Sequence, residues 1–421
     1  MYGRSWVRGR LGTVQTIFRE LRQGGRGWIL LGVAGGWLLS MGVRIIFPAM
    51  LPLFREAFDL TLTTAGLLIS VLWYAYALGQ FPGGVLGDRL GARIVLTAST
   101  LVSTVTIFLV ALAWDYRILF AATALFGFAT ALYGTTRFTV LTDVYSKRDG
   151  TAVSLTMAAG DVGNTLLPPL AVGIASWFSW RAGMGFTAPL FLCMGLFLWY
   201  AIPSGSLRAS DGDGTSATDG GDAATADGSS PSLRYVLSSI LLGPVLIATA
   251  IQFLGFFAWQ GFTSFFVTYL IETKGFSTGA ASTLFGFFFF LGLLVRPLSG
   301  LSHDTLGPRR TLMGILTLIT IGLSALSFVE GFIPLVVLTV LLSSLLGFTP
   351  TTQTFIANAL PTEIKGSGLG LLRTGHLLFG ATSATIVGFV ADIGYFDRAF
   401  LLLAGATGVA AVLSLFLPKL D

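Results

Sequence analysis

The sequence is poor in the residues that build metal sites, disulfides and water-facing surfaces. Its 421 residues include one cysteine, Cys193, and two histidines, His303 and His376. One cysteine excludes an intramolecular disulfide framework and a cysteine-rich metal site, and two histidines argue against a histidine cluster. Charged residues make up 11% of the chain, whereas soluble domains carry about 25%. This charge is too sparse to cover a surface in water, so we expect a lipid bilayer to surround the chain.

The sequence also has no pattern that predicts an enzyme. No nucleophile triad, metal motif or Gly-Lys-Ser/Thr phosphate loop occurs in it. We therefore expect no catalytic residue, no cofactor and no metal. The net charge of +5 comes from basic residues scattered between apolar runs. Membrane topology explains that distribution better than nucleic-acid binding does.

Long apolar runs dominate the chain, in which hydrophobic residues make up 54%. A helix needs roughly 20 apolar residues to cross a hydrocarbon core about 30 Å thick. Twelve stretches meet this requirement: 28–51, 61–83, 94–113, 118–144, 151–175, 182–202, 238–270, 279–300, 311–329, 332–358, 367–391 and 397–417. The sequence therefore predicts twelve membrane spans, with both termini on one side.

Basic residues predict which side that is. With the amino terminus inside, the inner segments hold sixteen Lys and Arg, whereas the outer loops hold five, namely Arg55, Arg117, Arg181, Lys274 and Arg398. The positive-inside rule then places both termini in the cytoplasm. Residues 1–27 carry six arginines. We interpret them as a cytoplasmic arm rather than a signal peptide, because the next apolar run is too long and lacks a small-residue cleavage site.

A charged motif occurs twice in the chain. GVLGDRLGAR begins at residue 84 after the second apolar run, and GLSHDTLGPRR begins at residue 300 after the eighth, so the offset is 300 − 84 = 216. The duplication predicts two homologous halves, 28–202 and 238–421. Between them, 203–237 is rich in Asp, Gly, Ser and Thr. That segment has too few apolar residues to fold, so we expect a flexible cytoplasmic linker.

Together these features resemble the major facilitator superfamily. The resemblance covers 28–417 and rests on twelve spans in two halves, the long central loop, and Gly-x-x-x-Asp-Arg-x-Gly-x-Arg at 84–93. The second copy departs from this motif, with Thr305 where the first has Arg89. The resemblance implies an all-α membrane protein with twelve transmembrane helices in two pseudo-symmetric six-helix bundles. It also implies secondary transport by alternating access, with spans one, four, seven and ten lining the cavity.

Arginines inside the spans are the first candidates for binding a substrate. An arginine at mid-membrane costs about 2.5–3.5 kcal/mol on insertion scales. Arg44 lies in the middle of span one and Arg137 in the inner half of span four. We expect both to bind an anion, and the alternative is a buried ion pair or a carbonyl contact. Arg373 and His376 share one face of span eleven and are further candidates, although Arg373 is also placed to reach the cytoplasm.

Asp161 is the one carboxylate well inside a span. It either accepts the coupling proton, because removal from water favours a protonated carboxyl group, or forms an ion pair with Arg137 or Arg44. The two roles are compatible if the substrate breaks the pair. Arg296, at the inner end of span eight, is interpreted as structural. Aromatic and amide side chains complete the expected site: Trp37, Tyr74, Tyr133, Gln252, Trp259, Gln260 and Gln353.

More buried arginines than buried carboxylates predict a positively charged cavity. We therefore predict a monomeric secondary active transporter of a small organic anion, such as a carboxylate, in a prokaryotic cell membrane. Transport would proceed by proton symport or exchange. The alternative is a drug or cationic-compound exporter of the same fold, which would favour acidic residues in the cavity. A membrane sensor or assembly protein is a third possibility, and it predicts an additional folded soluble domain.

The duplicated motif is interpreted as a latch at the inner ends of the helices rather than a binding site. We expect its charges to pair across neighbouring helices, with Asp143, at the end of span four, as a partner for Arg89 or Arg93. The residues assigned to this gate are Asp88, Arg89, Arg93, Asp143, Asp304 and Arg309. Such a cluster contributes about 1–3 kcal/mol, enough to bias a two-state equilibrium.

Replacing the motif carboxylate tests this latch. We expect Asp88→Asn to lower transport while the protein still folds, because the inner gate loses one of its charges. Uptake into proteoliposomes measures the first effect, and a monodisperse elution profile in detergent checks the second. A normal transport rate in this variant would contradict the latch.

Overall fold

The computed structural model describes residues 26–145, 148–203, 243–361 and 364–418, and all regular secondary structure in these ranges is helical. The first half contains α2 (Arg26–Ala49), α3 (Leu51–Phe58), α4 (Leu62–Leu90), α5 (Ala92–Ala111), α6 (Tyr116–Val144), α7 (Asp149–Trp177), α8 (Trp180–Gly185) and α9 (Thr187–Ala201). The second contains α11 (Gly243–Glu272), α12 (Thr278–Leu306), α13 (Pro308–Leu326), α14 (Phe332–Leu342), the 3₁₀ turn η2 (Ser343–Leu346), α15 (Phe348–Ala359), α16 (Lys365–Asp392) and α17 (Phe396–Ser414). The predicted arm, but for its last two residues, and the predicted linker, but for residue 203, lie outside the described residues.

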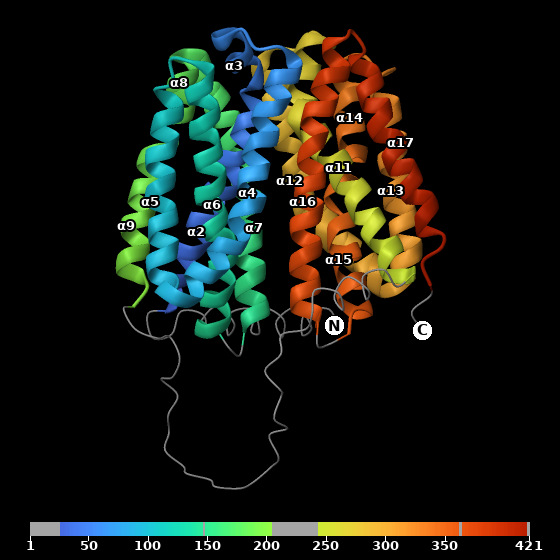
Figure 1. The fold of residues 1–421 in the computed structure, drawn as a ribbon. Helices are drawn as coiled ribbons and strands as arrows, with labels where there is room; N and C mark the ends of the chain where they lie inside the picture. Colours follow the sequence, from blue (N-terminus) through green and yellow to red (C-terminus); the bar gives the residue numbers. More distant parts are fainter. Residues whose placement is uncertain (1–25, 146–147, 204–242, 362–363, 419–421) are drawn as a thin grey trace, which may run out of the picture.

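The described helices form twelve spans, as predicted. Eleven described segments are long and apolar enough to span a bilayer, with α8–α9 and α14–α15 each forming one of them. The twelfth span is α7, which has 29 residues and is more polar because it carries Asp161 and Asn164. Figure 1 shows the helices standing side by side in two groups, α2–α9 and α11–α17. The predicted all-α fold of two six-helix bundles is confirmed.

The two bundles repeat one another with the offset that the motif indicated. Helices α4, α5, α6, α7 and α8 begin at residues 62, 92, 116, 149 and 180, whereas α12, α13, α14, α16 and α17 begin at 278, 308, 332, 365 and 396. Every pair differs by 216 residues, as in 278 − 62 = 216. A single offset across five helix starts means that each span and the loop after it have the same combined length in both halves, as well as the same order.

Local sequence explains why these paired helices begin and end where they do. Thr61 and Ser277 each accept a hydrogen bond from the backbone N–H three residues on, at 3.2 and 3.3 Å, and so cap α4 and α12. Gly91 and Gly307 both have φ of 80°, a left-handed conformation that other residues avoid, and they let the next helix start at once. Residues 84–90 therefore extend α4 by two turns beyond the predicted span, because helix is favoured until the glycine ends it.

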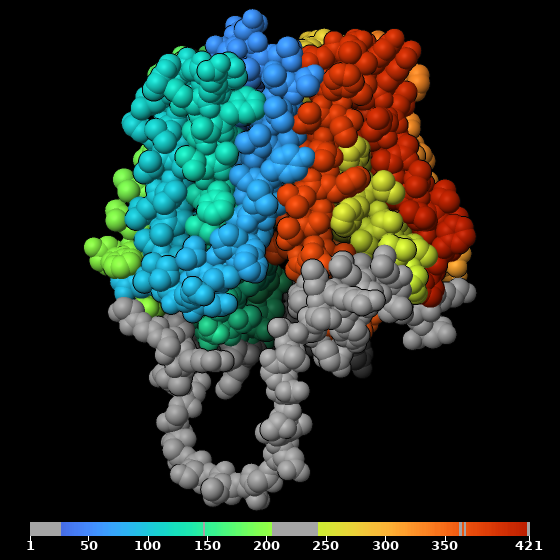
Figure 2. Space-filling model, in the orientation of Figure 1, coloured from blue at the N-terminus to red at the C-terminus, as the bar shows by residue number. Residues whose placement is uncertain are grey.

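The bundles touch along α4 with α16 and along α7 with α12. We call the end at which α2 begins the inner end, following the predicted topology. The α4–α16 contact lies toward the outer end, where Figure 2 shows the blue and orange-red surfaces meeting. A Cβ on Gly66 would lie 2.2 Å from the carbonyl oxygen of Ala384, and one on Gly388 would lie 2.2 Å from that of Leu62. Glycine is therefore required for the two backbones to approach this closely.

Polar contacts reinforce the outer closure. The carboxylate of Asp392, at the end of α16, accepts hydrogen bonds from the backbone N–H groups of Leu62 and Thr63 at 2.7 and 2.8 Å. This places a negative charge on the positive end of the α4 dipole, across the bundle interface. Arg55 of α3 also forms an ion pair with Glu272 of α11. The outer end is thus shut.

In this state the predicted latch is not formed. Among the described residues, neither Asp88 nor Asp143 lies within ion-pair distance of Arg89 or Arg93. The guanidinium of Arg93 instead stacks 4.1 Å from the ring centroid of Trp199. Unpaired latch charges are expected when the inner end is open. The paired form of the latch, with the inner end closed, therefore stays a prediction.

The glycine contact at the outer end predicts a conformational shift. Gly66→Val inserts a side chain where a Cβ already meets a carbonyl oxygen, and overpacking of this kind costs about 1–3 kcal/mol. We expect it to open the outer end. Spin labels on Glu56→Cys and Thr273→Cys, in a Cys193→Ser background, should then move apart. Gly405→Val is the matched control, because no atom lies within 4 Å of a Cβ there. An unchanged label distance in Gly66→Val would contradict this account of the closure.

Candidate functional site

A cavity of about 700 Å³ lies between the bundles. The first bundle lines it with residues of α2, α4, α6 and α7, and the second with residues of α11, α12, η2, α15 and α16. Its charged lining residues are Arg44, Arg137, Asp161, Arg296 and Arg373. Asp161 is the one carboxylate among the described lining residues, so the wall is strongly positive.

Arg44 projects from α2 into an aromatic box and is 1% exposed. Its guanidinium carbon lies 3.8 Å from the ring centroid of Tyr76, 5.4 Å from that of Trp73 and 5.5 Å from that of Trp37. Its Nε donates to the Ser40 carbonyl at 2.9 Å. The rings stabilise the cation by their quadrupoles, but they do not neutralise it.

Arg137 projects from α6 toward the same tryptophan and is also 1% exposed. Its guanidinium carbon lies 3.3 Å from the ring centroid of Trp37 and 4.2 Å from that of Phe138. Its Nη1 donates to the Gly134 carbonyl at 3.0 Å. Trp37 thus lies against both arginines and joins them into one cationic site, which we call the arginine pair.

Each member of the arginine pair makes one weak contact and leaves one donor unused. Arg44 Nη2 lies 2.9 Å from the Met41 sulfur, and Arg137 Nη2 lies 3.3 Å from the Met157 sulfur. Arg44 Nη1 and Arg137 Nε are buried without a partner in the described structure. Thioether sulfur is a weak acceptor on a flexible side chain. An oxyanion could therefore displace both methionines and gain stronger hydrogen bonds.

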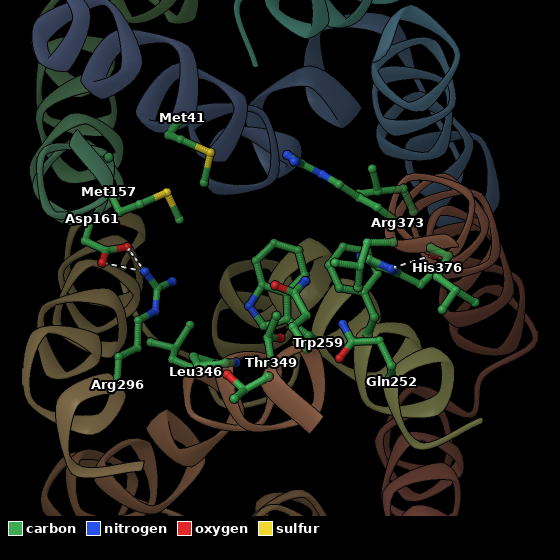
Figure 3. Close-up of a pocket in the computed structure, with 18 of the residues that line it drawn as sticks. Met41, Met157, Asp161, Gln252, Trp259, Arg296, Leu346, Thr349, Arg373 and His376 are labelled. Atoms are coloured by element: carbon green, nitrogen blue, oxygen red, sulfur yellow. Dashed lines mark hydrogen bonds and ion pairs between the residues drawn. The ribbon is translucent and has the colours of Figure 1, made fainter. Parts of the chain in front are cut away.

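One predicted role of Asp161 was an ion pair with Arg137 or Arg44. Asp161 does not form that pair. Its two carboxylate oxygens lie 2.6 and 2.5 Å from Arg296 Nη1, and Figure 3 shows this pair at one side of the cavity. The pair joins α7 to α12 and so crosses between the bundles. Arg296 lies near Asp161 because α7 and α12 pack together, a contact that sequence spacing did not indicate. The pair neutralises its own charge and leaves the arginine pair uncompensated.

The second bundle contributes Arg373 and His376 of α16. Arg373 has no hydrogen bond or ion pair among the described residues, and Figure 3 shows its side chain extending into the cavity. His376 Nδ1 lies 2.9 Å from the Leu372 carbonyl, which can only accept, so this nitrogen carries the proton. Phe256 lies edge-on to the imidazole at 4.8 Å. Gln252 and Gln353 also line this wall.

Three predicted residues lie away from the cavity. Tyr133 donates its hydroxyl to the Val33 carbonyl at 2.9 Å and so joins α6 to α2, whereas Gln260 donates to Ser264 at 3.3 Å within α11. Tyr74 is also absent from the lining. The cavity contains instead residues that the sequence prediction omitted: Met41, Trp73, Tyr76, Met157 and Phe256. The sequence does indicate two of these residues, because Trp73 and Tyr76 share a helical face with the intramembrane Gln80.

No metal site is formed by the described residues, because no three of their His, Cys, Asp or Glu side chains cluster. The described lining offers an anion a set of arginine donors, and it offers a cation one carboxylate that is already paired. The described lining thus suits an anion better than a cation.

Known proteins resemble this chain over most of its length. It is 24% identical to the hexuronate transporter of Bacillus subtilis (strain 168), over 86% of this chain and 87% of that one. It is 25% identical to the probable sulfoacetate transporter SauU of Cupriavidus necator, over 90% of each. A shorter match, 31% identical over 30% of this chain and 32% of the other, is to the multi-drug resistance efflux pump PmrA of Streptococcus pneumoniae serotype 4. Distant relatives therefore include both anion transporters and drug efflux pumps.

The fold and the family follow from two further comparisons. An inward-facing bacterial homologue of the human lysosomal transporter Spinster superposes with a TM-score of 0.79, covering 94% of this chain and 97% of that one at 13% identity. The model of the Major Facilitator Superfamily matches residues 32–347 and 280–421. The chain thus belongs to the Major Facilitator Superfamily, and it is a multi-pass membrane transporter of the secondary type rather than an enzyme.

Proposed function

We propose that this protein carries a small organic anion across the cell membrane of a bacterium, with the arginine pair as the anion site. The observation that supports this most is the pair of buried guanidinium groups without a carboxylate partner. Unpaired charges in a low-dielectric interior are costly. A substrate anion that supplies the missing countercharge would repay that cost on binding.

The geometry of the arginine pair favours a carboxylate or a similar planar or tetrahedral oxyanion. Guanidinium groups donate in a fixed fork that matches such oxygens. Both forks lie against the ring of Trp37, and the methionine sulfurs occupy donor directions that the anion would take. The distant relatives named for hexuronate and sulfoacetate support an anionic cargo.

We further propose that Asp161 couples transport to protons. Its pair with Arg296 joins α7 and α12, which belong to opposite bundles and must shift against each other in alternating access. Protonation of Asp161 would remove this bridge and leave Arg296 free to attract the anion. The coupling is then a competition between Asp161 and the substrate for cationic partners.

The runner-up is export of an apolar or cationic drug. The aromatic lining and the partial match to an efflux pump favour it. The charges disfavour it, because a cation entering the cavity would meet three arginines without an anionic partner. The topology with both termini in the cytoplasm and the monomeric state remain part of this proposal.

Neutralising the arginine pair provides the main test. Arg44→Gln and Arg137→Gln should each lower counterflow of a transported anion about 10- to 100-fold in proteoliposomes, because each removes charge-assisted hydrogen bonds worth about 1.5–3 kcal/mol. Arg117→Gln is the control, since Arg117 is exposed at the outer end. Unchanged counterflow in both cavity variants would refute the anion site.

Neutralising Asp161 separates coupling from structure. We expect Asp161→Asn to lose uptake driven by a pH gradient but to retain anion exchange at equal pH, because the asparagine cannot carry a proton. The double variant Asp161→Asn/Arg296→Gln removes both charges of the ion pair. Restored pH-driven uptake in the double variant would show that Asp161 acts only as a partner for Arg296.

A further inference from the structure

We propose that the substrate carries two acid groups, one bound by Arg44 and Arg137 and the other by Arg373. This inference rests on the proposed function and narrows its substrate class. The arginine pair lies on α2 and α6, in the first bundle, whereas Arg373 lies on α16, in the second. A diacid would therefore contact both bundles at once.

The charge balance of the cavity calls for a second anionic group. Four arginines and one aspartate line it among the described residues. Arg296 and Asp161 neutralise each other, so Arg44, Arg137 and Arg373 are left without a countercharge. One carboxylate has two oxygens and can bridge the two guanidinium groups of the arginine pair. Arg373 would then still face the cavity uncompensated.

Arg373 is placed to bind a ligand rather than to stabilise the fold. Its side chain is only partly buried, and it has no hydrogen bond or ion pair in the described structure. Figure 3 shows it reaching from α16 into the open space that Met41 faces from the other side. Polar groups stand beside it on the same wall, including His376 and the buried Gln252 Nε2, which has no partner among the described residues. This wall can therefore hold a polar head group.

The size of the cavity suits such a substrate. A volume of about 700 Å³ lies within the usual range for small-molecule sites. A diacid of four to six carbons would lie between the walls, with its chain against Trp37, Trp73 and Trp259. The aromatic lining would contact the chain, and the two ends would meet the two groups of arginines.

This arrangement gives the substrate a mechanical role. Closure of the inner end brings α16 toward α2 and α6, and so brings Arg373 toward the arginine pair. Like charges resist that approach in a medium of low dielectric constant. A diacid places a negative group before each cation and converts the repulsion into attraction. A monoacid compensates one side only, so it would bind but would favour closure less.

Matched acids test the inference directly. Binding to the purified protein is measured by calorimetry at one ionic strength for succinate against butyrate, adipate against hexanoate, and sulfoacetate against acetate. Glucose 6-phosphate is added as an anion whose two charges lie on one group. We expect at least one diacid to bind about tenfold or more tightly than its partner, the effect of one charge-assisted hydrogen bond.

Variants of Arg373 identify the second site. In Arg373→Gln the preference for the diacid should vanish, while monoacid affinity changes less than about threefold, since the arginine pair is intact. Arg373→Lys keeps the charge and should retain part of the preference, which separates binding from misfolding. Arg398→Gln, at an exposed outer residue, should behave like the unmodified protein.

The outcomes distinguish this inference from the proposed function. Equal binding of diacid and monoacid, or an equal loss of both in Arg373→Gln, overturns the two-acid substrate and leaves the anion site standing. Tight binding of glucose 6-phosphate that is unchanged in Arg373→Gln also overturns the two-acid substrate and leaves the anion site standing. Failure of every acid to bind overturns the proposed function, and the inference with it.

Discussion

Unpaired positive charge in a water-poor interior is the constraint on which the rest of this structure depends. Arg44 and Arg137 are almost fully buried, and neither meets a carboxylate. Backbone carbonyls, aromatic faces and two sulfur atoms support them, and each of these contacts is weaker than an ion pair. The helices around them must therefore be held by other means. Close backbone contacts provide this, at Gly42 and Gly163 beside Arg44 and at Gly66 and Gly388 at the outer end.

Because of this constraint, the outer end and the cavity have different roles in the conformational change. Closure at the outer end uses Gly66 and Gly388, which let α4 and α16 touch backbone to backbone, together with the cap from Asp392. These contacts are short-ranged and are either made or lost. The arginines that line the cavity act over a longer distance, and their electrostatic energy depends on what occupies the cavity. A cargo can thus bias a rocking motion whose end points are set by packing.

Much of the fold was predictable because membrane spans and duplication leave strong one-dimensional signals. Span number, the two halves and their offset follow from apolar runs and a repeated motif. The arginines of the cavity were also found, since a charge in a span is rare enough to stand out. Partners were not predictable in the same way. Asp161 meets Arg296 rather than Arg137 because α7 packs on α12, and that contact between bundles has no signature in local sequence.

Residue types with common structural uses were the other source of error. Tyr133 and Gln260 looked like cavity residues because they are polar and lie within spans, yet both satisfy hydrogen bonds between or within helices. Tyr76 lies against Arg44 and lines the cavity, whereas the predicted Tyr74, two positions away, does not. Two positions turn a helix by more than half a revolution, so such a choice needs the orientation of α4, which the sequence did not fix.

The repeat with its offset of 216 residues has a consequence for how this protein can change its cargo. Under that offset Arg44 corresponds to Gln260 and Arg137 to Gln353, so the second half has amides where the first has guanidinium groups. The two copies therefore differ in the side chains at these positions but keep the same spacing of helices along the sequence. Evolution could then retune the range of cargoes through α11, α15 and α16 alone, leaving the anion site in the first half intact.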